Sequence, residues 1–250
     1  MPRYKLTIEY DGRPYVGWQR QANGPSVQQC LEEAVQAFTG DPISVQGAGR
    51  TDAGVHATGQ VAHIDLATHH PADTVRDAVN AHLRPAPIAV LLVEPVPDSF
   101  EARFSAIERR YRYRIICRRA PLTIDQGLAW HVRYPIDVAA MAAAARHLVG
   151  QHDFTSFRAK ECQAKSPIKT LDLLVVTAAA TEISIVAEAR SFLHHQVRNM
   201  VGTLVEVGRG KLAADAIPSI LAARDRSAAG PTCPPDGLTL TGVGYPDPAA

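Results

Sequence analysis

The sequence predicts an α+β protein built from two halves, each with a split βαβ order of elements. In the first half, runs with strand or helix periodicity follow one another as strand, helix, strand, strand, helix, strand. This is the ferredoxin-like order. The second half has a similar order with one extra helix, although no sequence repeat links the halves. We therefore expect domains at 1–104 and 105–250, whose two sheets could join side by side with their loops meeting in one cleft.

Local sequence signals define the elements of the first half. Residues 4–10 alternate apolar and polar side chains, as a half-buried strand does. Ser26 followed by Gln29 predicts the start of a helix, and Gly40 closes it. The other expected elements are strands at 43–46 and 60–66, a helix at 73–83 that Arg84-Pro85 ends, and an apolar, β-branched run at 88–93 that is typical of a central strand.

The second half begins after a linker at 95–105. Residues 110–116 alternate arginines with Tyr111, Tyr113 and Ile115, which predicts a strand. Asp137 caps a helix that Gly150 ends. The remaining expected elements are strands at 168–176 and 182–189, helices at 192–207 and 214–223, and a last strand at 238–243.

Composition narrows the class of protein. No apolar run approaches the ~20 residues of a membrane span, and the N-terminus lacks the apolar segment of a secretory signal. The four cysteines stand far apart, which argues against a zinc site and against a disulfide framework. We therefore expect a cytoplasmic protein with reduced thiols, no metal and no cofactor.

Charge is unevenly distributed, although the net charge is only +1. Seven arginines and a single acid, Glu108, fall within residues 103–119. So dense a basic segment is typical of a surface that binds a polyanion. A solvated, charged strand edge explains it equally well. Both interpretations stay open from the sequence.

The segment Gly49-Arg50-Thr51-Asp52-Ala53-Gly54-Val55-His56 is the strongest candidate for chemistry. It lies between two predicted strands, and its glycines could fix a loop that exposes the Asp52 carboxylate. A plain turn with a local ion pair is the alternative. An ionised carboxylate can attack a sugar carbon or remove a proton, and the tyrosines of 110–116 could stack under a base. This combination suits a reaction at a nucleotide.

Other catalytic arrangements find little support. Residues 47–50 lack the Gly-Lys-Ser/Thr ending of a P-loop, and no Gly-x-Ser-x-Gly segment occurs. His69-His70 fall in a polar loop. We expect His194-His195 to be adjacent on a helix, where neighbouring residues cannot share a face. Neither pair is therefore expected to bind a metal.

Segments along almost the whole chain resemble the tRNA pseudouridine synthase A family. Besides the Asp52 segment they are Tyr10-Asp11-Gly12, Gly17-Trp18-Gln19, 103–113, 153–158, 192–202 and 234–238. The resemblance implies the pseudouridine synthase fold, with two ferredoxin-like halves joined into one extended, mostly antiparallel sheet around a central RNA-binding cleft. It also implies a homodimer that isomerises uridine to pseudouridine at positions 38, 39 and 40, in the anticodon arm of tRNA.

The resemblance further implies roles for individual residues. Asp52 would be the catalytic carboxylate, either attacking C1′ of the ribose or abstracting a C2′ proton. Tyr111 would stack on the uracil, and Arg198 would form a salt bridge with Asp52. Leu238 would line the uracil pocket, unless it is an ordinary core leucine. RNA contact or base flipping is implied for Arg50, His70, Arg103, Arg158 and Lys160.

Two other functions compete with this one. A non-catalytic RNA-binding protein would keep the tyrosines and the basic segment, but it would not need an ionised carboxylate in the Asp52 loop. A glycosidase or nucleotide hydrolase would use Asp52 with a second acid, and no such partner stands out near it.

Overall fold

A computed structural model describes residues 1–246, and the chain divides into two units. Unit 1 comprises Met1–Ile107 together with the described residues from Thr239 onward, and unit 2 comprises Glu108–Leu238. These bounds differ from the expected halves, 1–104 and 105–250, mainly at the last strand. Strand β11 (Leu238–Gly244) pairs in parallel with β3 (His56–Asp65) of unit 1, which places most of the last strand with the first unit.

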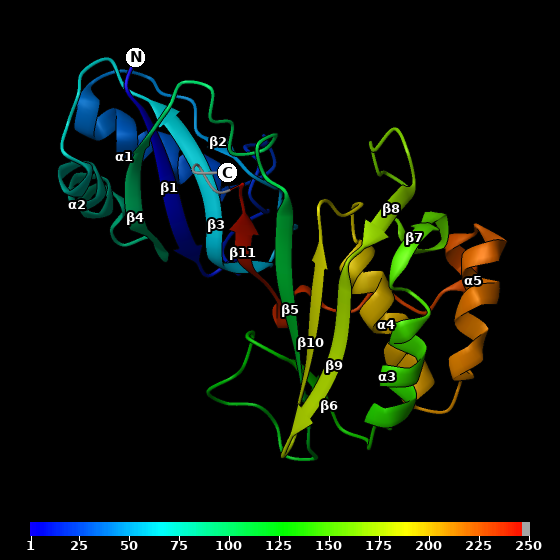
Figure 1. The fold of residues 1–250 in the computed structure, drawn as a ribbon. Coiled ribbons are helices and arrows are strands. Elements are labelled where there is room, and N and C mark those ends of the chain that lie inside the picture. The colour runs from blue at the N-terminus through cyan, green and yellow to red at the C-terminus, as the bar shows by residue number, and fades with distance from the viewer. Residues whose placement is uncertain (247–250) are drawn as a thin grey trace. The chain divides into compact units, whose positions relative to one another are not determined.

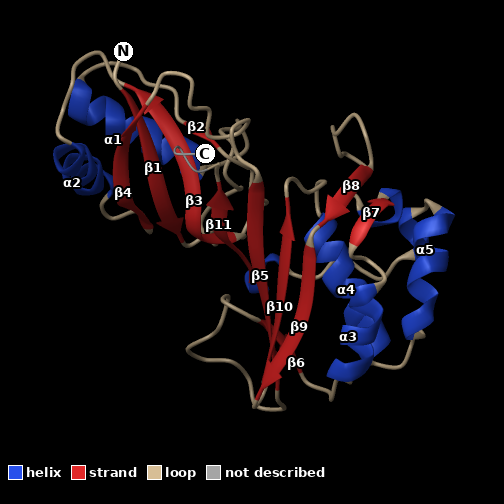
Figure 2. Cartoon of the chain, viewed as in Figure 1, coloured by secondary structure: helices blue, strands red, loops and turns tan. Residues whose placement is uncertain are grey.

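Unit 1 follows the expected strand and helix order (Figures 1 and 2). β1 (Arg3–Tyr10) is flanked by antiparallel neighbours, β3 and β4 (Ile88–Val96), and the short β2 (Gln46–Gly47) pairs with β3. The buried face of β1 consists of alternate residues, as the sequence predicted: Tyr4, Leu6, Ile8 and Tyr10.

Both helices of unit 1 begin close to where the sequence placed them. In α1 (Val27–Thr39) the Ser26 side chain accepts a hydrogen bond from the Gln29 N–H (3.2 Å), and Gly40 ends the helix with φ +81°. These are the predicted caps. α2 (Ala72–Leu83) packs beside α1 and ends at Arg84.

Two strand predictions in unit 1 were wrong in part. The strand expected at 43–46 is reduced to β2, which contributes two residues. The strand expected to be central, β4, lies at an edge, since among the described strands it pairs with β1 alone. Its Leu91 and Leu92 are accordingly 44% and 47% exposed. A continuous apolar run does not distinguish the centre of a sheet from its edge.

Unit 2 is built on antiparallel strands with helices beside them (Figure 1). β10 (Glu182–Ala189) pairs with β5 (Glu108–Cys117) and with β9 (Leu173–Ala179), and β6 (Trp130–Val132) runs parallel to β5. β7 (Gly150–Asp153) and β8 (Ile168–Leu171) form a separate pair. The helices are α3 (Val138–Arg146), α4 (Gln196–Gly208) and α5 (Ile217–Ala223), with 3₁₀ turns at Thr155–Phe157, Ala214–Ala216, Arg226–Ala228 and Pro235–Gly237.

The helix boundaries of unit 2 depart from the prediction in several places. α3 ends at Arg146, before the expected Gly150, and α5 begins at Ile217 because 214–216 form a 3₁₀ turn. Asp137 caps α3 as expected, with its Oδ1 accepting from the Ala140 N–H (2.9 Å). α4, however, begins at Gln196 rather than at Phe192. The apolar pattern extends back to Phe192 because its ring packs edge-on against Tyr111, with the ring centroids 5.3 Å apart. Tertiary packing, not helical periodicity, therefore explains why position 192 is apolar.

Both units thus combine mostly antiparallel strands with separate helices, which confirms the predicted α+β class. No helix among residues 1–246 is long and apolar enough to cross a membrane.

The segment that follows β4 is tied to the body of unit 1. The Nδ1 atom of the buried His63 accepts a hydrogen bond from the Ala102 N–H (3.1 Å). Burial, with Arg3 nearby, lowers the pKa of His63 below its ordinary value of 6.5, although Asp65 and Glu101 act in the opposite direction. The folded protein therefore holds this imidazole neutral, as an acceptor must be.

The lowered pKa predicts how stability depends on pH. Below about pH 6.5 the unfolded chain takes up a proton at His63 that the folded chain resists. This contribution to the free energy of unfolding is complete above that value, and it is lost as the pH falls toward the folded pKa. The free energy of unfolding, measured by urea denaturation between pH 7 and pH 5, should fall less with decreasing pH for His63→Gln than for the wild type. An equal dependence on pH in the two proteins would contradict the prediction.

Gly202 of α4 predicts a second stability effect. A Cβ atom at this position would lie 1.7 Å from the carbonyl oxygen of Pro231. Backbone must shift to relieve that overlap, so we expect Gly202→Ala to destabilise unit 2 by about 1–3 kcal/mol or more. Gly242→Ala is the matched control, because nothing lies within 4 Å of its Cβ position. Thermal denaturation that gave the two variants the same midpoint would contradict this.

Candidate active site

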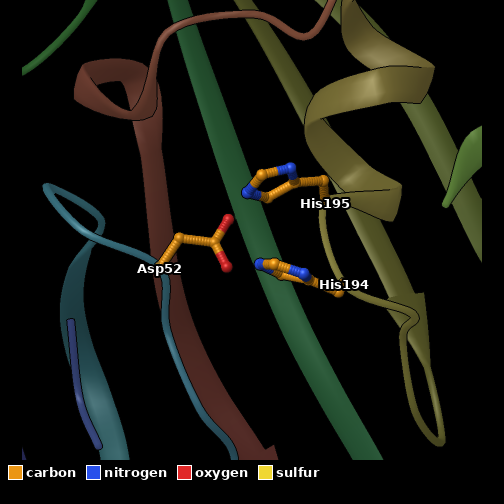
Figure 3. Close-up of side chains that lie close together, drawn as sticks. All are labelled: Asp52, His194 and His195. Atoms are coloured by element: carbon orange, nitrogen blue, oxygen red, sulfur yellow. The ribbon is translucent and has the colours of Figure 1, made fainter. Parts of the chain in front are cut away.

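Asp52 lies in the loop that leads into β3, with its side chain half-buried (Figure 3). The loop is fixed by hydrogen bonds at both ends. The Thr51 hydroxyl pairs with the Tyr10 hydroxyl (2.8 Å) inside unit 1, and Gln60 Nε2 donates to the carbonyl of Gly49 (2.9 Å). Burial raises the pKa of Tyr10 to about 12, so this phenol keeps its proton at neutral pH.

Close backbone approaches hold the same loop from its other side. The Trp18 N–H donates to the Thr51 carbonyl (3.0 Å). Gly17 has φ +117°, and a Cβ there would lie 2.6 Å from the Thr51 oxygen. A Cβ at Gly12 would lie 2.1 Å from the Val55 oxygen. Two glycines of the family-like segments are therefore required by the space around the Asp52 loop.

The other candidate residues of unit 1 occupy different settings. Arg50 is exposed, next to the fixed Thr51. His70 is half-buried. Its backbone N–H donates to the Tyr4 hydroxyl (2.9 Å), and its ring centroid lies 5.0 Å from that of Phe38. His70 therefore packs against α1 and is tied to β1, just before α2 begins. Arg103 is exposed, with its guanidinium carbon 5.5 Å from the centre of the Phe104 ring.

In unit 2 the structure brings three of the resembling segments together. Arg198 of α4 donates from Nε to the carbonyl of Cys233 (2.9 Å), and Tyr113 of β5 donates to the carbonyl of Pro234 (2.8 Å). Leu238, only 5% exposed, follows this segment directly. Tyr111 is 9% exposed and shares the inward face of β5 with Tyr113.

A polar network centred on the buried Asn199, the residue after Arg198, was not predicted from the sequence. Asn199 Nδ2 donates to the Phe157 carbonyl (2.8 Å), and its Oδ1 accepts from Thr232 (2.6 Å) and from Arg226 (3.1 Å). Arg226 also donates to the carbonyl of Gly230 (2.9 Å). Asn199 was visible as a polar residue within a helical apolar pattern, whereas Arg226 gave no local signal. The network ties α4 to the segment that leads to Leu238.

Arg158 and Lys160 follow the 3₁₀ turn Thr155–Phe157 that Asn199 anchors. Arg158 is half-buried and Lys160 is exposed. The backbone that carries these two side chains is therefore tied to the same network as Arg198.

The structure corrects the prediction for His194 and His195. They were expected on a helix, but α4 begins after them, and their ring centroids lie 4.0 Å apart. His195 occupies the N-cap position of α4 (Figure 3). Its φ of +62° is a strained conformation for a residue other than glycine.

The basic segment is more neutral than its sequence suggests. On the outward face of β5, Arg110 pairs with Glu108 and Glu188. Arg114 pairs with Glu182 (2.8 Å) and Asp125 (3.0 Å). For these two arginines the structure favours the solvated strand face over the polyanion site, because acids of β5 itself, of β10 and of the loop before β6 already pair with them.

Comparison with known proteins places the chain in a family. A family model described as tRNA pseudouridine synthase matches residues 6–105 and 144–246. A protein of Paramagnetospirillum magneticum named tRNA pseudouridine synthase A is 62% identical over 245 residues, covering 98% of this chain and 96% of that protein. One of the same name from Parvibaculum lavamentivorans is 61% identical, covering 98% and 100%. A solved structure described as a Cbf5-Nop10-Gar1 complex gives a TM-score of 0.39 at 10% identity, covering 96% of this chain and 50% of that one, which supports no argument.

The α+β fold with its mostly antiparallel strands is the fold expected of a pseudouridine synthase. The chain belongs to the tRNA pseudouridine synthase family, and it is accordingly an isomerase that acts on uridine in tRNA.

The Tyr10–Thr51 hydrogen bond predicts a coupled effect on stability. Tyr10→Phe leaves the Thr51 hydroxyl without this partner in a buried setting, so we expect a loss of about 1–2 kcal/mol in the free energy of unfolding. Adding Thr51→Val should recover part of that loss, because both polar groups are then gone. Urea denaturation of the single and double variants measures the coupling. If the losses in the free energy of unfolding of the two single variants simply add in the double variant, the hydrogen bond does not stabilise the loop.

Proposed function

We propose that the enzyme isomerises uridine at positions 38, 39 and 40 in the anticodon arm of tRNA, with Asp52 as the catalytic carboxylate. The observation that carries the proposal is the Asp52 loop itself: a half-buried carboxylate on a loop held by buried hydrogen bonds and by glycines that no other residue can replace without a backbone shift. Such fixation suits a group that must meet one carbon atom of a substrate.

The reaction moves one bond and one proton. The N1–C1′ glycosidic bond breaks, the uracil turns, and a C5–C1′ bond forms. C5 then loses its hydrogen as a proton, and N1 gains one. Asp52 starts the reaction in one of two ways. It attacks C1′ as the N1–C1′ bond breaks, which gives a covalent intermediate from which C5 later displaces the carboxylate. Alternatively it takes the C2′ proton as uracil leaves, which gives a glycal, and it returns that proton to C2′ when C5 adds to C1′. Either path begins with an ionised carboxylate.

Residues of unit 2 supply the remaining roles in this proposal. Tyr111 stacks on the uracil and is available as the base that removes the C5 proton; its ring is held edge-on by Phe192. Arg198 binds the substrate, with its Nε already engaged by the Cys233 carbonyl. Leu238 lines the uracil pocket, although its 5% exposure also suits an ordinary core leucine.

The basic residues carry the RNA contacts in this proposal. Arg50 assists base flipping by filling the vacated stack or by holding the flipped phosphate. Contacts to the RNA backbone, which position the RNA without reading its sequence, are assigned to His70, Arg103, Arg158 and Lys160. We further propose that the enzyme acts as a cytoplasmic homodimer.

Tritium release tests the reaction and the residue together. Joining C5 to the ribose expels the C5 hydrogen, so tRNA carrying 5-tritiated uridine should release tritium with the wild type. We expect Asp52→Asn and Asp52→Ala to slow release on the order of 10³-fold or more. Binding of tRNA should change little, because phosphate contacts dominate affinity.

The control and the contrary outcomes are specific. Asp41→Asn, at an exposed carboxylate after α1, should release tritium at the wild-type rate. Release that persists in Asp52→Asn would assign the chemistry to another group. The positions are mapped on tRNAs that carry tritiated uridine only at 38, 39 or 40. No release from these tRNAs, with release from tRNA labelled elsewhere, would overturn the proposed positions.

A further inference from the structure

Phe104 presents its ring to solvent, with 72% of its surface exposed. Leaving a phenylalanine in water forgoes the stabilisation that its burial would bring. It stands in the turn between β4 and β5, and the guanidinium of Arg103 lies over its ring at 5.5 Å. A flat apolar face with a cation beside it is thus offered at the surface.

The turn that carries Phe104 is closed on both sides. The Ser105 N–H donates to the Glu101 carbonyl (2.9 Å), and the Ser105 hydroxyl accepts from the Glu101 N–H (3.0 Å). Ala102, which is fully buried, donates to His63 and accepts from the Tyr245 hydroxyl (2.7 Å). The exposed ring therefore stands on an anchored backbone rather than on a loose loop tip.

The residues that precede the turn are anchored as well. Arg3 donates to the carbonyls of Asp98 (2.6 Å) and Phe100 (2.8 Å) while pairing with Asp65. The Phe100 ring packs against Tyr245, with the centroids 4.9 Å apart. Little conformational entropy remains for a ligand to remove here, which is how a preformed binding surface behaves.

The size and surroundings of the exposed ring indicate its partner. Its two immediate neighbours along the chain, Arg103 and Ser105, are polar, Ala102 and Ala106 are buried, and the next exposed apolar side chain is Ile107. A protein partner would need a contiguous apolar patch of several hundred Å², whereas one ring matches one nucleobase. Splayed RNA bases stack on aromatic side chains and on arginine planes. The family substrate, tRNA, supplies such bases in its loops.

We propose that Phe104 is a stacking platform for an unpaired base of the tRNA substrate, with Arg103 beside it. The inference rests on tRNA as the substrate, which the family establishes, and not on the roles proposed for Asp52 or for positions 38–40. It adds an aromatic contact where the sequence suggested only backbone contact by Arg103.

Three substitutions separate stacking from simple apolar contact. Phe104→Ala and Phe104→Leu both remove the π face, and Leu keeps the apolar volume. Phe104→Trp keeps the face and enlarges it. We expect the first two to bind tRNA about five- to a hundredfold more weakly and Trp to bind at least as well as Phe. Ile107→Ala is the matched control, because this exposed apolar residue (52%) has no ring.

Fluorescence gives a direct readout of the contact. In Phe104→Trp a new indole is added to Trp18, which is buried, and Trp130. Stacking on a base should quench its emission when tRNA binds, and the wild type measures the response of the two native tryptophans. A blunt-ended RNA duplex without unpaired bases should give no extra quenching.

The outcomes that overturn the proposal are distinct. If Phe104→Ala binds tRNA as the wild type does, or if Phe104→Leu is as good as Phe104→Trp, no base stacks there. If Phe104→Ala instead changes the mass in sedimentation, the ring contacts a second copy of the chain. A wild type that releases no tritium from tRNA would contradict the proposed function, whereas an active wild type with an unaffected Phe104→Ala contradicts only this inference.

Discussion

The buried contact between the hydroxyls of Tyr10 and Thr51 is the constraint on which the candidate active site depends. It ties the Asp52 loop to the first strand of the chain, and Gln60 ties the start of the same loop to β3. A carboxylate that reacts with a sugar needs a fixed position more than it needs an unusual pKa, since a misplacement of about 1 Å can cost orders of magnitude in rate. The glycines at 12 and 17 are the steric counterpart of this constraint, because they let β1 and the following loop come close enough to hold Thr51 and Val55.

Unit 2 uses the same device with different groups. Asn199 hydrogen-bonds through its amide nitrogen to Phe157 and through its amide oxygen to Thr232 and Arg226. Arg226 also donates to the Thr232 hydroxyl. The buried amide of Asn199 tolerates few alternative arrangements, because an unmade hydrogen bond there costs more than a made one contributes. The carbonyl of Cys233, which receives the Arg198 Nε, lies in the segment held this way. The position of a proposed substrate residue therefore depends on residues that never need to touch substrate.

Sequence reasoning succeeded where a single local cause determines the structure. Ser26, Gly40 and Asp137 act as caps because each one satisfies or ends a helix within a few residues of itself. It failed where a distant partner decides. β4 is an edge strand because, among the described strands, it pairs with β1 alone. The apolar pattern before α4 reflects the contact of Phe192 with Tyr111 rather than a helical turn. The Asp52 loop was identifiable from its resemblance and its composition, but Arg226 became visible only through its partners.

The arginines of β5 show why counting charges along a sequence overstates nucleic-acid binding. Seven arginines in a short segment predict a strong field, yet Arg110 and Arg114 face acids from neighbouring strands and loops. A charge already paired in the folded protein contributes little to the release of counterions from RNA, because binding would first have to break its ion pair.

Features that lower the stability of the fold are more informative about binding than the number of charges. An exposed ring on an anchored turn is one, because its apolar surface stays in water, and a histidine with φ +62° at the start of α4 is another, because a helix needs no such strain to begin. The Phe104 ring lies in a segment that resembles the family, where the proposed contact with a tRNA base gives this cost a reason.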